Sequence, residues 1–194
     1  MNKRKYIPLY IILAITLALI VAPFASPKEL HNININFTFD TEYTIAKRAI
    51  ETDTNFIKMP PCMQLHFALI YYSNKYDIPK EYAFTIAQLE TGYRGPFDWD
   101  YDHRQVSYAG ALGAMQLMPR TARWMYDNEN RGLLTKKRIK NDIKLNVEIS
   151  MKFLRHSYDR FGDWKKTFAY YHTGYTKVNW YAEKVWNKEY KFIN

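Results

Sequence analysis

Hydrophobic and polar positions divide the chain into three parts. An apolar run without a charged residue extends from Tyr6 to Ala25. Residues 27–58 are mixed in polarity, and within them NININFTF (32–39) alternates polar and apolar positions, which favours a short strand. We interpret 27–58 as a spacer. From residue 59 to the end, apolar positions recur at helical spacing, which predicts an all-α domain.

Several helices of the third part have recognisable ends. Pro79 and Pro119 are suited to the first turn of a helix. Asp163, and either Asn141 or Asp142, are suited to N-caps. Glycines at 92, 162 and 174 are suited to helix C-termini. The predicted helices cover residues 62–77, 79–92, 141–162 and 163–174, a helix that begins at Pro119, and a last helix over about 179–192.

The start of the chain has the features of a targeting segment. Lys3, Arg4 and Lys5 precede the apolar run. This order is typical of a signal peptide or membrane anchor over residues 1–26, so we expect the rest of the chain to be exported to the periplasm or cell envelope. A run of about 20 residues is long enough to cross a bilayer. Whether the segment is cleaved as a signal peptide or retained as an anchor in the inner membrane remains open.

Composition and charge narrow the classes of partner. The chain has 47% hydrophobic residues, 17 tyrosines and a formal charge of +9, which falls to +6 without the three basic residues of segment 1–25. A basic exported domain meets anionic envelope polymers or membranes. Export argues against nucleic acid as a partner. The single cysteine, Cys62, excludes an intramolecular disulfide and a multi-cysteine metal site, and we expect it in the core.

One carboxylate falls on an apolar helix face. Residue Glu90 continues a stripe with i, i+3, i+4 and i+7 spacing, whose other members are Ala83, Ile86 and Ala87. Burial and the helix C-terminus at Gly92 both disfavour a charged carboxylate, and such a pocket raises a Glu pKa from about 4.3 to roughly 6. This favours a general acid. The alternative is a Glu that reaches water or pairs with Arg94 or Arg104.

A glycine-rich segment is the second candidate for a functional site. Glycines 110 and 113 allow the backbone to pass close to a ligand, and Gln116 offers a donor and an acceptor to a sugar. The alternative is a turn between helices that buries its apolar side chains, which are Met115, Leu117 and Met118.

Five motifs in order resemble the soluble-type lytic transglycosylases, a family with a goose-lysozyme-like fold. They are ETGY (90–93), SYAGALGAMQLMPRTA (107–122), NVEISMKFL (146–154), AYYHTG (169–174) and WYAEKV (180–185). The resemblance covers about residues 61–186. It implies that residues 59–194 form a lysozyme-like helical domain with a substrate cleft. It also implies cleavage of peptidoglycan glycan strands between N-acetylmuramic acid and N-acetylglucosamine, with a 1,6-anhydro end.

The resemblance also implies roles for particular residues, without a cofactor or metal. Glu90 is then the sole catalytic acid and base. Thr91 positions the carboxylate or the substrate, and Tyr171 hydrogen-bonds the carboxyl group. The remaining positions implied to contact substrate are Met115, Gln116, His172 and Tyr181.

The sequence departs from the family pattern at several points. His172 replaces a common Asn, and Tyr181 lacks the acidic residue that often precedes it, which leaves a packing role open for Tyr181. The link 94–106 is long. Its carboxylates at Asp98, Asp100 and Asp102 give a weak hint of a calcium loop, although a solvated loop fits better because the Gly and Glu of an EF-hand are missing.

Two other functions remain open. One is a hydrolase (muramidase) of the same fold that uses Asp98 or Asp102 as a second carboxylate. The other is a non-catalytic wall-binding or scaffold subunit. By analogy with the family, candidate partners also include the membrane, through the N-terminal segment, and an envelope complex for secretion, conjugation or phage entry.

Overall fold

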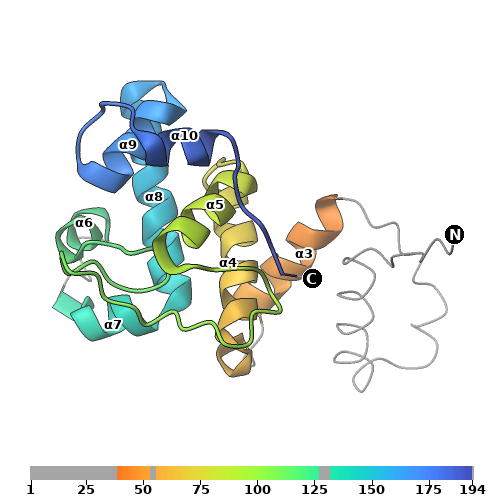
Figure 1. Ribbon diagram of the computed structural model, residues 1–194. Helices are drawn as coiled ribbons and strands as arrows, with labels where there is room; N and C mark the ends of the chain where they lie inside the picture. The colour runs from red at the N-terminus through yellow and green to blue at the C-terminus, as the bar shows by residue number, and fades with distance from the viewer. Residues whose placement is uncertain (1–38, 53–55, 127–131, 194) are drawn as a thin grey trace, which may run out of the picture. The chain divides into compact units, whose positions relative to one another are not determined.

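The computed structural model describes residues 39–52, 56–126 and 132–193, and the regular elements of these ranges are helices (Figure 1). They contain no β-strand; two isolated bridges join Leu112 to Val106 and to Leu117. The all-α prediction is therefore confirmed for the described part of the chain. The eight helices are α3 (Phe39–Glu51), α4 (Pro61–Lys75), α5 (Lys80–Thr91), α6 (Pro119–Met125), α7 (Lys136–Asn141), α8 (Ile143–Phe161), α9 (Trp164–Thr173) and α10 (Trp180–Trp186), and a 3-10 turn covers Phe56–Lys58.

The predicted signal or anchor and most of the alternating segment lie in residues 1–38, outside the described ranges. Within those ranges, none of the helices combines the length and the apolar character that a membrane span needs.

Helix α4 forms the centre of the folded unit. It packs against α3, α5 and α8. Its side chains are buried on most sides, with Leu65 and Leu69 fully inaccessible, as the nearly continuous apolar sequence predicted. Each such buried side chain stabilises the fold by about 1.5–3 kcal/mol. Figure 1 shows α9 and α10 at the top, and α6 and α7 lower on the left. The C-terminal end of α5 lies between these two pairs of helices in this view.

Local sequence sets the helix ends near the candidate site. The Asp142 and Asp163 side chains accept hydrogen bonds from backbone N–H groups in the first turns of α8 and α9. Gly92, Gly162 and Gly174 end their helices in the left-handed conformation, with φ of 70°, 61° and 77°. These boundaries agree with the sequence prediction to within two residues. Gly92 ends α5 two residues after Glu90. Glu90 is therefore placed in the last turn of the helix.

Part of the predicted spacer belongs to the folded unit. Residues 39–51 form α3, which packs against α4 and buries Ala46, Ala49 and Ile50. The Glu42 carboxylate pairs with Lys80 and lies 3.7 Å from the His66 ring. The unit therefore begins near residue 39 rather than at 59. The prediction missed α3 because its apolar face is short and only contact with α4 completes the burial.

The last helix is shorter than predicted. It ends at Trp186, and Lys188 adopts a left-handed φ of 57°. The chain then runs back along α5, where Gln88 exchanges two hydrogen bonds with the Lys191 backbone (2.8 and 2.9 Å). The Phe192 ring packs against the rings of Phe84 and Tyr93, so pairing with α5 and burial of an aromatic ring replace further helix.

Candidate active site

Glu90 lies in the last turn of α5, on the stripe that the sequence predicted. The other three stripe residues (Ala83, Ile86 and Ala87) are fully inaccessible, whereas Glu90 is partly buried and reaches the surface. Burial raises the pKa of its carboxyl group from 4.5 to about 7, and a hydrogen bond from Tyr181 partly opposes this shift. The group is therefore largely protonated at mildly acidic pH and half ionised near neutrality, as a general acid and base requires.

Tyr181 is the hydrogen-bond partner of Glu90. Its hydroxyl group donates to Oε1 at 2.6 Å, and its side chain is 2% exposed. The side chain is therefore almost inaccessible to a ligand, and the structure favours a role in holding Glu90 over the predicted contact with substrate. Packing against α9 buries this ring, and the ring carries the hydroxyl group across to α5.

His172 covers the ring of Tyr181. The two rings are parallel within 5° with centroids 4.4 Å apart, and Trp180 contacts the imidazole edge-on at 5.5 Å. His172 itself is exposed, and partial burial lowers its pKa from the usual 6.5. The imidazole therefore lies at the surface beside the Glu90–Tyr181 pair, where it is accessible to a ligand.

The predicted hydrogen bond from Tyr171 to Glu90 is wrong. The Tyr171 hydroxyl group donates instead to the backbone carbonyl of Met115, at 2.7 Å. Tyr171 therefore attaches α9 to the glycine-rich segment. The sequence motifs offer Tyr171 and Tyr181 as candidates, and only the packing of α9 and α10 determines which one reaches the carboxyl group.

Met115 does not line the surface. Its side chain is fully inaccessible, and its backbone N–H donates to the Asn146 side chain at 2.8 Å. The predicted contact between the Met115 side chain and substrate is therefore wrong. Met115 instead supports the glycine-rich segment through its backbone N–H.

Gln116, the residue after Met115, is partly exposed. It adopts a left-handed φ of 46°, which is unusual for a residue with a side chain. Its amide nitrogen donates to the backbone carbonyls of Gly113 and Gln105, at 2.9 and 3.3 Å. These bonds hold the side chain in place and engage its donors, so the carbonyl oxygen is the part that remains for a sugar N–H or O–H.

Thr91 joins the end of α5 to the same segment. Its hydroxyl oxygen lies 2.9 Å from the carbonyl oxygen of Ala114 and 2.8 Å from the hydroxyl group of Tyr101. The residue is buried at 7% exposure. It therefore positions backbone next to Glu90, and it does not face a ligand as one reading of the motif implied.

The sequence analysis assigned no role to Asn146, which organises the glycine-rich segment. It is fully buried, and its amide nitrogen donates to the carbonyls of Leu112 and Ile139 at 2.8 and 3.0 Å. A Cβ on Gly113 would lie 2.6 Å from that nitrogen, so this glycine is needed for the approach of Asn146. One feature of the sequence could have indicated this role of Asn146: a polar amide side chain stands at a buried position of the third motif.

Two carboxylates of the long link 94–106 are hydrogen-bonded to arginine side chains of the same link. Asp98 is buried and accepts two hydrogen bonds from Arg94 (2.8 and 3.2 Å), and Asp102 accepts from the Arg104 side chain at 3.0 Å. Both arginines that were candidate partners of Glu90 are thus paired elsewhere. Across the described ranges, no group of three or more His, Cys, Asp or Glu side chains is arranged to hold a metal ion.

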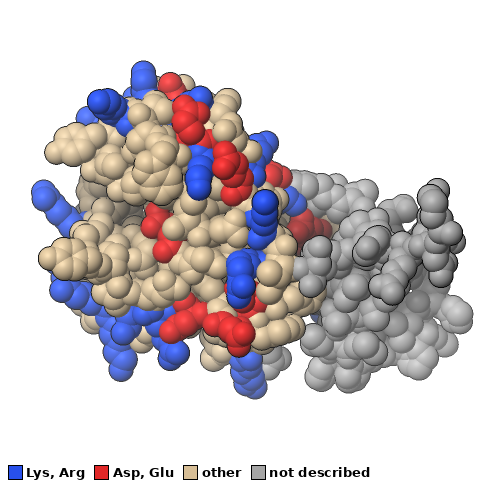
Figure 2. All heavy atoms as spheres, viewed as in Figure 1, with Lys and Arg blue, Asp and Glu red and all other residues tan. Residues whose placement is uncertain are grey.

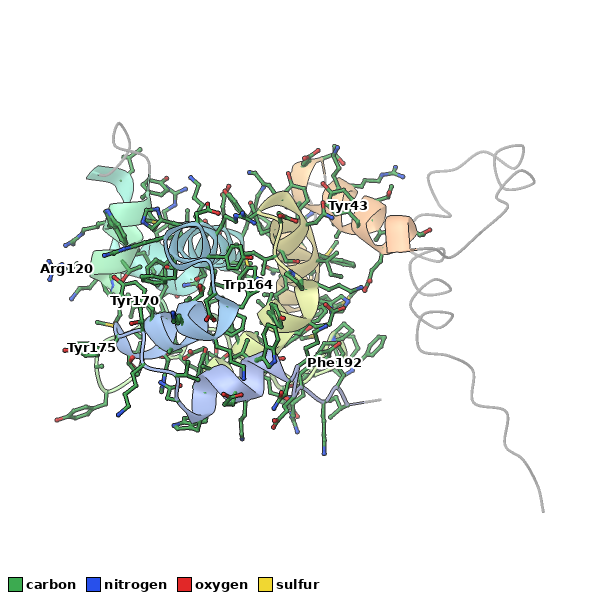
Figure 3. All side chains as sticks on the ribbon, turned by 90° about the horizontal axis from the view of Figure 1, so that it is seen from above. Tyr43, Arg120, Trp164, Tyr170, Tyr175 and Phe192 are labelled. Carbon is green, nitrogen blue, oxygen red and sulfur yellow. The ribbon has the colours of Figure 1, made fainter. Side chains whose placement is uncertain are left out.

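Several aromatic side chains of the segments 107–110 and 174–180 are exposed. Tyr108, Tyr175 and Trp180 all have more than half of their surface accessible. Figure 2 shows the surface indented on its left side, between the part formed by α9 and α10 and the part formed by α6 and α7. Figure 3 shows Tyr175, Tyr170 and Arg120 toward one end of the unit and Phe192 and Tyr43 toward the other. Flat, exposed rings suit sugars.

Comparison with known protein families identifies the domain. A family model described as "Transglycosylase SLT domain" matches residues 67–194, which is most of the described part of the chain. A comparison with curated proteins finds no match.

Proposed function

Because the chain belongs to the transglycosylase SLT domain family, whose members are lytic transglycosylases acting on peptidoglycan, we propose that Glu90 alone carries out this reaction as acid and base. The bond cleaved is the β-1,4 bond between N-acetylmuramic acid and N-acetylglucosamine, and the product carries a 1,6-anhydro ring. The observation that supports this most strongly is the partly buried carboxyl group with a pKa near 7, held by a single tyrosine hydroxyl.

The reaction requires two proton transfers at one carboxyl group. Protonated Glu90 donates to the glycosidic oxygen as the bond from that oxygen to the muramyl C1 breaks. The resulting carboxylate then removes the proton of the muramyl 6-hydroxyl, whose oxygen bonds to C1. The proton returns to Glu90, and no water is consumed. A hydrolase uses a second carboxylate to activate or replace water, whereas this route needs only one.

Tyr181 supports both halves of this cycle. Its donated hydrogen bond stabilises the carboxylate formed after the first transfer, and it fixes one carboxyl oxygen so that the other faces the substrate. Apolar neighbours on the stripe keep the carboxyl group partly desolvated, so that it retains its proton near neutral pH.

A hydrolase on the same fold receives less support. Its candidate second carboxylates, Asp98 and Asp102, are each hydrogen-bonded to an arginine of the same link. Each of these carboxylates is therefore engaged by a neighbouring cation rather than available to activate water.

Product analysis tests the proposal directly. Purified protein is incubated with sacculi, and the soluble fragments are weighed by mass spectrometry. We expect anhydro ends, one water lighter than reducing ends, and their loss in Glu90→Gln. The matched control Glu189→Gln, at an exposed site, should retain full activity. Reducing ends alone would indicate a hydrolase, and unchanged activity in Glu90→Gln would exclude catalysis by this residue. Absence of soluble fragments from the unmodified protein would leave only the wall-binding function.

We further propose that the domain acts outside the cytoplasm, either released or held in the inner membrane. The support is the basic and apolar sequence of residues 1–26. Cell fractionation combined with N-terminal sequencing of the recovered protein tests this. Recovery in the cytoplasm would contradict export, and an N-terminus after residue 25 would identify cleavage.

A further inference from the structure

A basic surface surrounds α7. Residues 132–144 carry five lysines and arginines, and Asp142 is the one carboxylate of this range. Figure 2 shows Lys and Arg side chains gathered at the lower left, where Figure 1 places α7. We call this surface the α7 face. Its basic residues are Lys136, Lys137, Arg138, Lys140 and Lys144.

A groove of about 680 Å³ opens on the α7 face. Lys137, Arg138 and Lys144 line it together with the 3-10 turn, whose Ile57 side chain is 79% exposed. An exposed aliphatic side chain therefore lies among three basic ones. None of the residues that surround Glu90 lines this groove.

Little of the positive charge is neutralised within the folded unit. The three lysines of α7 form no hydrogen bond or ion pair with any described residue. The Lys144 ammonium donates to the neutral carbonyl of Ile50 at 2.8 Å. Only Arg138 has an anionic neighbour on this surface, the Asp142 carboxylate at 3.8 Å. The α7 face therefore attracts anions.

Carboxylates of the neighbouring segments are engaged by other cations. Asp102 pairs with Arg104 at 3.0 Å. Glu148, one helical turn after Lys144, pairs with Lys75 of α4 at 3.0 Å. Lysines four residues apart on α7 also repel each other. The excess charge is therefore better explained by a partner outside the unit than by the stability of α7.

The exposed apolar side chains favour one class of anionic partner. Besides Ile57, Leu133 is 64% exposed just before α7. A soluble polyanion such as a nucleic acid matches the charge but leaves both side chains in water. An anionic bilayer offers phosphates to the basic residues and the boundary of its acyl chains to the aliphatic groups, and lysine stems are also buried well there.

We propose that the α7 face docks on a membrane that contains anionic phospholipids. The basic residues contact headgroup phosphates, the groove admits a headgroup, and Ile57 enters the boundary of the acyl chains. Figure 1 shows α7 at the bottom of the unit and α9 and α10 at the top, so docking leaves these two helices away from the membrane. Docking does not depend on the reaction at Glu90.

The predicted N-terminal anchor is compatible with this contact. Residues 27–38 separate it from α3 and span at most about 40 Å. Helix α3 adds about 20 Å, and its Ile50 carbonyl contacts Lys144. A retained anchor therefore keeps the α7 face within roughly 60 Å of the bilayer and raises its local concentration there. Without an anchor, the α7 face binds by itself.

Lysine labelling on the full-length chain tests the proposal. The chain is added to vesicles of phosphatidylcholine alone or with about 30% phosphatidylglycerol, so that an anchor can insert in both. An amine reagent labels the lysines, and mass spectrometry gives the rate at each position. We expect Lys137 and Lys140 to react about 5-fold more slowly on the anionic vesicles. The rates should recover in about 1 M salt, which screens charges beyond about 3 Å. Exposed Lys166, on α9, should react equally on both.

Two variants separate the charge from the apolar contact. Lys144→Gln should weaken docking on the anionic vesicles about 5-fold, measured as faster labelling of Lys137. Ile57→Ser keeps every charge and should also weaken docking, because it loses the apolar contact. The matched control Lys166→Gln removes a charge from the other end of the unit and should dock like the wild type.

Three results would overturn the proposal. The first is equal labelling of Lys137 on both kinds of vesicle. The second is equal protection of Lys137 by duplex DNA or inorganic phosphate added to phosphatidylcholine vesicles, which would assign the α7 face to a soluble anion. The third is docking by Lys144→Gln and Ile57→Ser that is as strong as docking by Lys166→Gln.

Discussion

Replacing Glu90 by Gln should stabilise the protein, and increasingly so as the pH rises. Gln has nearly the same shape, and its amide oxygen still accepts the hydrogen bond from Tyr181. The unfolded chain releases the Glu90 proton near its ordinary pKa of 4.5, whereas the folded protein retains it until about pH 7. Between these values folding takes up a proton, so the wild type loses stability as the pH rises.

The magnitude follows from the two pKa values of this carboxyl group, 4.5 and about 7, whose difference corresponds to about 3 kcal/mol. Because part of the side chain reaches solvent, we expect about 2 kcal/mol to be measured. The gain of Glu90→Gln over the wild type should be close to zero at pH 4.5, should grow through pH 5–7, and should be constant above pH 8.

Urea unfolding at several pH values, followed by tryptophan fluorescence, measures this difference. Glu189→Gln controls for loss of a charge at an exposed site. A Glu90→Gln variant whose free energy of unfolding differs from that of the wild type by the same amount at every pH would refute the reasoning. A variant less stable than wild type at pH 8 would show that the carboxylate is well solvated or paired.

Three further substitutions test the surroundings of the site. Tyr181→Phe removes the hydrogen bond that lowers the pKa of Glu90, so the pH at which activity is half lost on the alkaline side should rise, and the rate should fall about 10-fold; an unchanged pH–rate profile would contradict this. Gly113→Ala places a Cβ 2.6 Å from the Asn146 amide at a φ of 78°, and urea unfolding should show a loss of about 2–3 kcal/mol; wild-type stability would mean that Asn146 shifts freely. Asp163→Ala removes the N-cap of α9 and should cost about 1 kcal/mol in the same assay, with Asp163→Asn close to wild type.

Elements that depend on local sequence were predicted well. Capping side chains and glycines act on their own helix ends, so the limits of α5, α8 and α9 follow from short stretches of sequence. The position of Glu90 was predicted for the same reason, because helical spacing alone places it on the face of Ala83, Ile86 and Ala87.

Features that depend on contacts between distant segments were missed or misassigned. Helix α3 forms only because α4 buries its face, and the last helix ends early because the chain pairs with Gln88. The hydrogen bond to Glu90 comes from Tyr181, 91 residues away, rather than from Tyr171. The sequence by itself thus determined which carboxyl group is set in an apolar face, since that is a property of one helix. Only the tertiary structure decided which side chains hold it, because that choice depends on how α5, α9 and α10 pack together.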